Sequence, residues 1–466
     1  MEHKLKLYNT YTRKTEEFKP VKDGQTRIYS CGPTVYDYVH IGNLRTYLLT
    51  DVLKRVLQHD GYQVEDVMNI TDVGHLTGDS DAGEDKMEKG AKNIGKTVWD
   101  VARFYEQAFK GDIELLNIRP AKFYPRATEH VKDQITLIEK LQEKGFVYET
   151  PEALYFDVSK FPEYTKLSGQ KLEDKLTGAR SEVVKDEKKR NPADFALWFR
   201  LVGKFENHTM HWPSPWGEGF PGWHLECSAM STKYLGQPFD IHVGGIDLVM
   251  PHHTNEIAQS TAAFDKPLAN YWVHGEHLLI DKSKMAKSEG NFLRLQTLID
   301  KGFSPLAFRY LVLGAHYRTK LNFTWESLEA AQNALDHLYE KISELEGEAS
   351  VAMCEDYARA FEREINNDLD MPRVLSLTWR LMKKPNPDKL KLSTLKKFDD
   401  VLGLDLLANA AERKKIPAEA KQLASEREKF RAKKDFASAD KIRDELLAQG
   451  YEIKDTESGP LLRKTK

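Results

Sequence analysis

The chain has 466 residues, enough for a main domain and one or two smaller ones, and its 40% hydrophobic content is sufficient for a core. The formal net charge of −3 argues against a surface that is basic throughout, although a local basic face could still bind nucleic acid. We find neither a charged and then apolar leader nor an apolar run of spanning length, so we expect a cytoplasmic protein without membrane contact.

The chain contains only three cysteines, Cys31, Cys227 and Cys354. An odd and sparse set argues against a disulfide framework and favours metal-binding or free-thiol roles. Cys354 lies in a stretch with a helical pattern and is interpreted as a small apolar residue.

The first predicted unit, residues 24–70, is a strand, a helix and a second strand (62–70), a right-handed crossover of the Rossmann kind. The loop turns through Gly32 and reaches His40 and Gly42 where the helical pattern begins. The N–H groups and positive dipole end of a helix start suit a phosphate, and Gly42 would allow close approach; ordinary loop chemistry is the alternative. The apolar face of this helix comprises Leu44, Tyr47, Leu48, Val52, Leu53, Val56 and Leu57.

An acidic, glycine-rich loop follows the second strand. Its carboxylates could form a calcium site, but their spacing does not fit an EF-hand. Amphipathic helices are predicted over 97–117 and 129–144. Short alternating segments and a charged run over 146–192 indicate an insertion, and we expect the nucleotide fold to resume with the segment DFALWFR, 194–200.

Potential metal ligands occur in the next two blocks. A loop with several tryptophans, which usually pack in a core, leads into a helix begun by residues 224–227. A strand over 239–243, the Gly244–Gly245 turn and a further helix follow, and in that helix His252 and Glu256 share one face, as two metal ligands must.

Together with Cys31 and Cys227, each at a strand or helix junction on the same side of the sheet, these residues form a set of two thiolates, an imidazole and a carboxylate. This mixture is typical of zinc, although such His–Glu pairs also occur on solvated helices. Beyond them, the segment IDKSKMAKSEGN (280–291) contains three lysines in a polar loop that could clamp a phosphate.

The C-terminal third is predicted to be helical. Residues 305–313 and 325–345 begin a helical region that continues to Leu404, and 418–449 forms one or two charged helices before a strand-like tail. Residues 413–466 hold 15 Lys and Arg against 10 Asp and Glu, so the basic asymmetry lies here. A solvated lysine-rich helix explains this charge as well as a binding face does.

HIGN (40–43) and KMAKS (284–288) in a Rossmann-like chain resemble the HIGH and KMSKS motifs of class I aminoacyl-tRNA synthetases. The ordered blocks CGPTVYD, GWHLECS, PHHTNEIAQS and KMAKSEGN are similar to those of the cysteinyl-tRNA synthetase family, over nearly the whole chain. Asn43 and Ala286 depart from the usual motifs. Because Asn43 can still donate from its amide and Ala286 leaves both motif lysines in place, we expect activity to survive.

The resemblance implies an α/β fold: a Rossmann-like parallel-sheet catalytic domain with an insertion, then an α-helical bundle and a small C-terminal domain. The implied division is a first catalytic half (1–120), a connective insertion (121–192), a second half with the zinc site and KMAKS loop (193–300), a bundle that contacts the tRNA stem (301–410) and a basic anticodon-binding region (411–466).

The implied reaction is ATP-dependent activation of L-cysteine to cysteinyl adenylate, followed by transfer to the 3′ end of cysteine tRNA. A pocket that distinguishes substrates by size alone would discriminate cysteine from serine by only ~1–3 kcal/mol of binding free energy. One zinc ion per chain, held by Cys31, Cys227, His252 and Glu256, would bind the substrate thiolate in preference to a hydroxyl, so no editing site would be needed. Mg2+ would accompany ATP through its phosphates.

The family motifs also imply residue roles. The expected catalytic residues are His40, Asn43, Lys284 and Lys287, acting by positioning and by stabilising charge. The ATP site would comprise His40, Gly42, Asn43, Gly244, Gly245, Lys284 and Lys287. Thr34, Trp223 and Asp247 are expected at the substrate, with Asp247 on either the amino group or the ribose. The charged run that ends at Arg190 would contact the tRNA acceptor end or be a solvated loop, and we expect a monomer.

Two other functions stay open. A related ligase that joins cysteine to an amino sugar would share the zinc and ATP blocks, but it has no need of the basic region 418–466. A non-catalytic, synthetase-like RNA-binding protein is suggested only by Asn43 and Ala286, and the retained His40, Lys284 and Lys287 argue against it.

Overall fold

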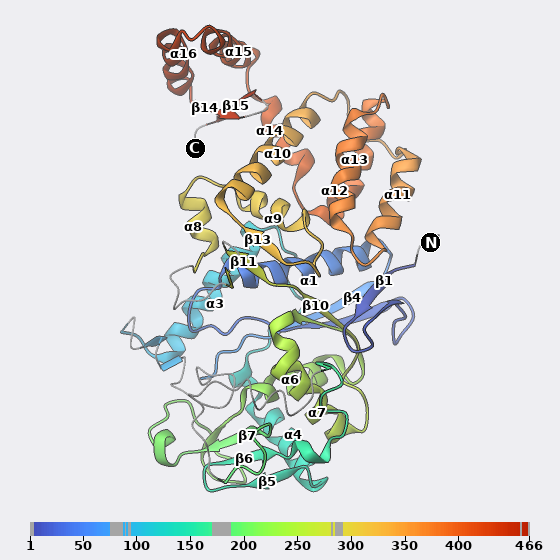
Figure 1. Ribbon diagram of the computed structural model, residues 1–466, viewed down its shortest axis with the longest axis vertical. Coiled ribbons are helices and arrows are strands. Elements are labelled where there is room, and N and C mark those ends of the chain that lie inside the picture. Colours follow the sequence, from blue (N-terminus) through green and yellow to red (C-terminus); the bar gives the residue numbers. More distant parts are fainter. Residues whose placement is uncertain are drawn as a thin grey trace. The chain divides into compact units, whose positions relative to one another are not determined.

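The computed structural model describes residues 4–74, 87–88, 90–91, 95–169, 188–280, 283–284, 292–456 and 459–464 (Figure 1). The chain forms two compact units, Met1–Leu295 with Tyr317–Leu321, and Gln296–His316 with Asn322–Lys466. Within these described ranges, no helix combines the length and the apolar character needed to cross a membrane.

The first unit contains a four-stranded parallel sheet, as predicted. It comprises β3 (Gln25–Ser30), β4 (Gln63–Met68), β9 (Phe239–Gly245) and β10 (Ala269–Gly275), in the order β10-β9-β3-β4. The chain builds β4 on one side of β3 and β9 on the other, and Ser30 pairs with Val243. The strand order therefore reverses between β3 and β9, and in open parallel sheets ligands bind at the carboxyl ends of the strands beside such a reversal.

Helix α1 (Ile41–His59) connects β3 to β4, so the predicted strand–helix–strand crossover is confirmed, and every residue of its predicted apolar face is buried. Figure 1 shows α1 on one face of the sheet and α6 (Trp223–Leu235) and α7 (Thr254–Phe264) on the other. The helices predicted after β4 are α3 (Val98–Leu115) and α4 (Val131–Glu143), which the short η1 (Ala127–His130) precedes.

A second, antiparallel sheet is formed by β5 (Val147–Glu149), β6 (Ala153–Phe156), β7 (Phe195–Arg200) and β8 (Gly219–Pro221), paired in chain order. The prediction that the nucleotide fold resumes with β7 is therefore wrong, since the parallel sheet resumes only at β9. Phe195 and Leu197 pack in one core cluster, and Ala196 and Phe199 pack in another. A strand covered on both faces gives an unbroken apolar run, which sequence alone does not distinguish from a strand of a parallel sheet.

The remaining elements of the first unit are short. They are β1 (Lys6–Asn9), β2 (Lys14–Glu17), η2 (Val158–Lys160), η3 (Gly203–Phe205), η4 (Ile246–Leu248), η5 (Val249–His253), β11 (Leu278–Ile280) and β12 (Ser283–Lys284). Strand β12 pairs antiparallel with β11, Leu279 facing Lys284. Because η4 and η5 directly follow β9, the chain stays at the carboxyl edge of the parallel sheet before α7 begins.

The second unit is mainly helical, as predicted. Its helices are α9 (Pro305–Leu313), α10 (Trp325–Ser343), α11 (Glu355–Ile365), α12 (Met371–Lys383), α13 (Asp388–Leu402), α14 (Leu406–Lys414), α15 (Ala418–Ala432) and α16 (Phe436–Ala448). Helix α8 (Leu295–Asp300) and strand β13 (Leu321–Phe323) adjoin the boundaries between the units. The predicted tail is a hairpin of β14 (Tyr451–Thr456) and β15 (Gly459–Lys464).

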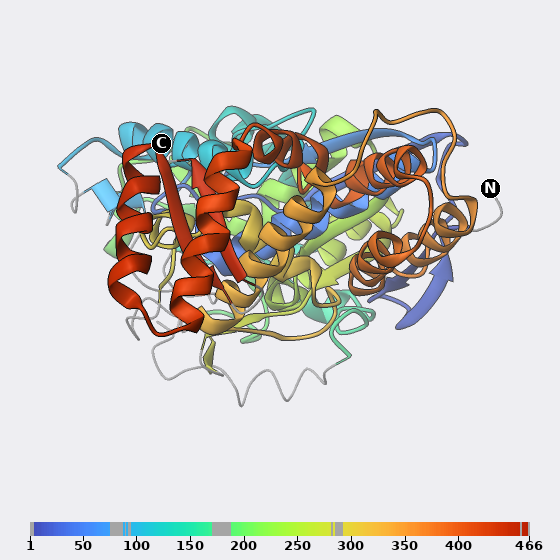
Figure 2. The ribbon, with the colours of Figure 1, turned by 90° about the horizontal axis from the view of Figure 1, so that it is seen from above.

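Helices α15 and α16 lie side by side, as Figure 2 shows in red. A small core of their own holds them to the hairpin, and it comprises Ile416, Ala420, Ala424, Leu446, Ile453 and Leu462. The segment predicted to form one or two charged helices therefore forms two, and they have an apolar inner side.

Candidate active site

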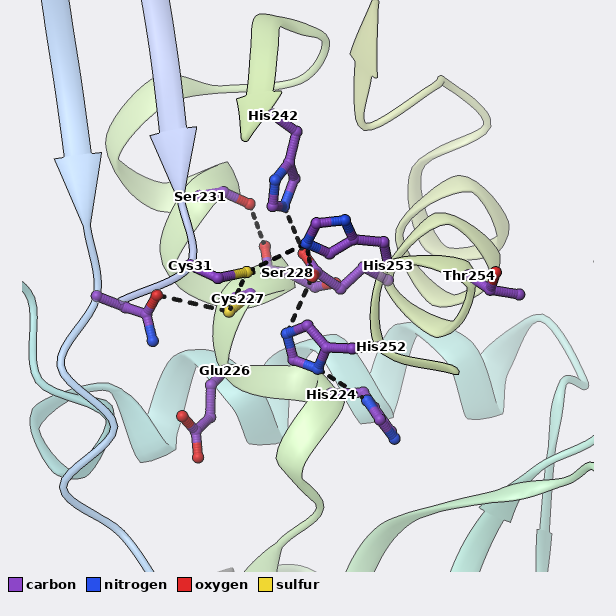
Figure 3. Close-up of polar contacts among 12 residues, drawn as sticks. Cys31, His224, Glu226, Cys227, Ser228, Ser231, His242, His252, His253 and Thr254 are labelled. Atoms are coloured by element: carbon purple, nitrogen blue, oxygen red, sulfur yellow. Dashed lines mark hydrogen bonds and ion pairs between the residues drawn. The ribbon is translucent and has the colours of Figure 1, made fainter. Parts of the chain in front are cut away.

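Four predicted metal ligands converge at the carboxyl edge of the parallel sheet (Figure 3). Cys31 directly follows β3, Cys227 lies in the second turn of α6, His252 in η5 and Glu256 in the first turn of α7. One donor atom from each lies within 4.8 Å of the others. Cys31 is half-buried and the other three are buried. The prediction that these residues come together in space is confirmed.

The separations fit a tetrahedral zinc site. Zinc–sulfur bonds of about 2.3 Å imply a sulfur–sulfur edge of about 3.8 Å, and bonds of about 2.0 Å to nitrogen and oxygen imply an edge of about 3.3 Å. The Sγ atoms of Cys31 and Cys227 are 3.8 Å apart, and His252 Nε2 lies 3.1 Å from Glu256 Oε1. The donor set therefore fits zinc in chemistry and in spacing.

The charges in this cluster also favour a cation. Burial raises the pKa of Cys31 well above its ordinary value, and the neighbouring Cys227 and Glu256 raise it further. Burial also acts to raise the pKa of Cys227, but the hydrogen bond with Cys31 and the charge of His252 outweigh it and lower this pKa. Burial acts to lower the pKa of His252, yet Glu256 and Cys227 outweigh it and raise this pKa to about 9. A bound divalent cation would replace the proton that this site otherwise holds.

Two further histidines, which sequence reasoning missed, complete a second possible set with Cys31 and Glu256. His253 Nε2 lies 3.3 Å from Cys31 Sγ, and its Nδ1 contacts His274 Nε2 at 2.7 Å. His242 Nε2 lies 3.0 Å from Glu256 Oε2, and the other ring nitrogen of His242 is buried with no hydrogen-bond partner among the described residues. His242 and His252 thus bracket the two oxygens of one carboxylate.

Asn69, just beyond the end of β4, supports the cysteine side of the cluster. Its Oδ1 accepts the backbone N–H of Gly32 at 2.9 Å and lies 3.7 Å from Cys227 Sγ, while its Nδ2 donates to Thr71 Oγ1 at 3.1 Å. Thr71 in turn donates to Glu226 Oε2 at 2.7 Å. The backbone N–H of Gly32 requires an acceptor at this Asn69 atom, so the hydrogen bond sets the orientation of the amide and holds the turn that carries Cys31.

The HIGN segment begins α1 with a reciprocal cap. His40 Nδ1 accepts the backbone N–H of Asn43 at 3.1 Å, and Asn43 Oδ1 accepts the backbone N–H of His40 at 3.2 Å. The Asn43 departure is thereby explained in part, because an asparagine at this position supplies the acceptor that a capping box needs and keeps its amide donors.

The remaining predicted residues lie around this edge. Gly244 and Gly245 end β9, and an added Cβ would lie 2.5 Å from the His253 ring at Gly244 and 2.4 Å from Asp247 Oδ1 at Gly245. Asp247 is exposed in η4. Trp223 is half-buried, with its ring centroid 4.5 Å from that of His252.

Thr34 lies beside Thr71 through a backbone bridge between the ends of β3 and β4. The backbone of Lys284 lies in β12, whereas Lys287 lies outside the described residues, as does most of the acidic loop after β4. The roles predicted for all these residues stay predictions.

Comparison with known proteins identifies the family to which the chain belongs. Residues 17–333 match the family described as tRNA synthetases class I (C) catalytic domain. A protein of Burkholderia lata named cysteine–tRNA ligase 1 is 48% identical over 98% of this chain and 96% of its own length. The cysteine–tRNA ligase of Treponema denticola is 44% identical over 97% of this chain and 98% of its own length.

The chain belongs to the cysteine–tRNA ligase family. It is thus a class I aminoacyl-tRNA synthetase, and the resemblance inferred from its motifs is confirmed. Among solved structures, a Mycobacterium tuberculosis methionyl-tRNA synthetase in complex with methionyl-adenylate matches with a TM-score of 0.54 at 14% identity, over 83% of this chain and 91% of that chain. At this identity the likeness concerns the fold, and it agrees with the predicted α/β architecture.

The two histidines that sequence reasoning missed differ in the signal that the sequence carries for them. His253 is three residues before Glu256 and so shares its helical side, a spacing that could have identified it. His242 lies inside β9, where alternation predicts only which face a side chain occupies. Its contact with Glu256 depends on how α7 packs on the sheet.

Proposed function

We propose that this chain activates L-cysteine with ATP and transfers the cysteinyl group to the 3′ end of cysteine tRNA. The observation that supports this most strongly is the buried cluster in which Cys31 Sγ and Cys227 Sγ lie 3.8 Å apart beside His252 and Glu256. Such a soft site beside a helix start suits an enzyme that recognises a thiol and a nucleotide together. The cysteine–tRNA ligase names of the relatives support the same reaction.

In this proposal one zinc ion per chain is held by Cys31, Cys227, His252 and Glu256. This set is preferred to the one with His242 and His253 because it contains both sulfurs, which zinc binds strongly. When bound, the ion supplies a soft Lewis acid that prefers a thiolate to a hydroxyl. His242 and Asn69 then hold the carboxylate and the Cys31 turn in place, as residues behind metal ligands commonly do.

The amino-acid pocket would be completed by three residues around this cluster. Trp223 stacks near His252 and would form one wall against the substrate side chain. Thr34, at the start of the β3–α1 loop, would contact the substrate backbone. Asp247 is exposed at the carboxyl end of β9, so its carboxylate is accessible to the substrate amino group or to the ribose.

Activation requires attack by a cysteine carboxylate oxygen on the α-phosphorus of ATP, which breaks the bond to the β-phosphate and releases pyrophosphate. His40 and Asn43 at the start of α1, with Gly42, Gly244 and Gly245, would bind and orient the nucleotide. Lys284 and Lys287 would neutralise charge on the departing pyrophosphate, and Mg2+ would bind through the phosphates. The tRNA ribose hydroxyl then attacks the carbonyl carbon, and AMP departs.

The tRNA would lie along the helical unit. We assign 301–410 to the tRNA stem and 411–466 to the anticodon, because residues 413–466 carry a basic excess of 15 Lys and Arg against 10 Asp and Glu. The insertion would contact the acceptor end. We further propose that the protein acts as a monomer in the cytoplasm.

The test is cysteine-dependent exchange of pyrophosphate into ATP by the purified protein, with serine in place of cysteine as the control. Charging of purified cysteine tRNA follows with the same preparation. Exchange with cysteine and not with serine supports the proposal. Equal exchange with both amino acids, or none with cysteine, would overturn it.

A further inference from the structure

Three consecutive residues after the KMAKSEGN segment contact the start of α1. The ring of Phe292 meets the His40 ring edge-on, with centroids 5.6 Å apart at 87°. The carbonyl of Leu293 accepts the backbone N–H of Ile41 at 2.9 Å. The Arg294 guanidinium lies over the ring of Tyr38, 4.1 Å from its centroid. Residues 292–294 thus lie along residues 38–41, which are the end of the loop before α1 and the first residue of that helix.

The Tyr38 ring is itself fixed by α3. It meets Tyr105 edge-on at a centroid distance of 5.0 Å and Phe104 at 6.0 Å, which leaves one ring face for the guanidinium. Arg294 is half-buried, and its charge also reaches α3. Burial raises the pKa of Asp112 to about 6, and the positive charge of Arg294 opposes that rise.

This arrangement constrains His40 from two directions. The cap with Asn43 engages Nδ1 of its ring, and Phe292 packs against the ring edge. Phe292 is held only if residues 292–294 stay against α1. A planar guanidinium stacked on an aromatic face is suited to this because it holds both position and orientation, at a strength of about 0.5–2 kcal/mol.

We propose that Tyr38 and Arg294 are positioning residues for adenylate formation. Their stacking holds 292–294 against the start of α1 and thereby keeps the His40 imidazole where it meets the nucleotide. This inference rests on the proposed function, because His40 is assigned to ATP there. Neither residue touches the buried cluster of Cys31 and Cys227, so the cysteine site should not depend on them.

The test is a double-mutant cycle in the exchange assay with Tyr38→Leu, Arg294→Met and the double variant. We expect each single variant to lower kcat about 5- to 20-fold, as loss of a contact that orients a reacting group does, with the KM for cysteine and the zinc content unchanged. The double variant should be no slower than the slower single variant. Tyr38→Phe, which keeps the ring, should match the wild type, and Arg294→Lys should recover part of the loss.

The matched control is Lys110→Met, which removes a cation that lies 5.5 Å from the ring centroid of Tyr124 and has no assigned role in the site. It should leave tRNA-independent exchange unchanged. Wild-type kcat in Arg294→Met, or losses that multiply in the double variant, would overturn the inference. The inference would also be overturned if the KM for cysteine rose together with the loss of kcat, or if a lowered Tm accounted for that loss. Absence of cysteine-dependent exchange in the wild type would instead refute the proposed function.

Discussion

Gly32 lies where the turn after β3 passes closest to the end of β4, and its replacement by alanine tests how the cysteine cluster is built. An added Cβ would lie 1.7 Å from the backbone oxygen of Asn69 and 2.9 Å from its carbonyl carbon. Non-bonded heavy atoms are most stable near 3.5 Å, so the turn must move by about 1–2 Å. Both obstructing atoms belong to the backbone, and no change of rotamer relieves the contact.

That movement has two costs. Two hydrogen bonds lengthen or break, and each loss costs about 1 kcal/mol of folding free energy. They run from the Gly32 N–H to Asn69 Oδ1 at 2.9 Å and from the Thr71 N–H to the Pro33 carbonyl at 3.0 Å. Cys31 moves with the turn, so its sulfur leaves the 3.8 Å distance from Cys227 that a tetrahedral ion needs. We expect Gly32→Ala to lose about 2–4 kcal/mol of folding free energy, with strain included, and to bind zinc about 10- to 100-fold more weakly.

The assay is zinc affinity by chelator competition, together with the urea dependence of unfolding. Gly111→Ala is the matched control, because a Cβ at this helical position meets nothing within 4 Å. It should keep wild-type zinc affinity and gain up to about 1 kcal/mol from helix propensity. Wild-type zinc affinity and stability in Gly32→Ala would refute the argument that this turn places Cys31.

Three further predictions concern other parts of the molecule. Cys227→Ser should lose zinc and cysteine selectivity together, as measured by metal analysis and by exchange with serine; full zinc content would contradict the ligand assignment. Lys287→Ala should slow adenylate formation with zinc still bound, and unchanged exchange kinetics would remove it from the catalytic residues. Burial raises the pKa of Asp399 from 3.8 to about 6. The folded state therefore binds this proton more tightly than the unfolded state, and this carboxylate makes stability fall as the pH rises from about 4 to 6. The stability of Asp399→Asn relative to the wild type should accordingly improve by about 2 kcal/mol between pH 4 and pH 7 in urea titrations, and a pH-independent difference would contradict it.

The local parts of this structure were predictable because they depend on short-range periodicity. The four-residue spacing of His252 and Glu256 indicates a shared helical side, and positions after buried strands indicate the carboxyl edge of a parallel sheet. These rules made a cluster of Cys31, Cys227, His252 and Glu256 a hypothesis, and the resemblance to the cysteinyl-tRNA synthetase family made it the prediction. The Rossmann-like crossover followed from the apolar stripe of α1 in the same way.

What the sequence did not reveal depends on tertiary packing. The strand β7 has an apolar run that fits either sheet, and only its pairing with β6 and β8 assigns it. The contact of His242 with Glu256 requires a particular placement of α7 over β9. The stacking of Arg294 on Tyr38 joins segments that are far apart in the sequence, and neither the HIGN motif nor the KMAKS motif predicts this contact.

The central claim is that cysteine is distinguished from serine by a metal at the buried cluster of Cys31, Cys227, His252 and Glu256. The most direct measurement is calorimetric binding of cysteine and of serine to the protein with one zinc per chain and to the same protein after the metal has been removed. We predict that the zinc-loaded protein binds cysteine and rejects serine, and that removal of the metal abolishes this preference. A metal-free protein that still prefers cysteine to the same degree would contradict the account.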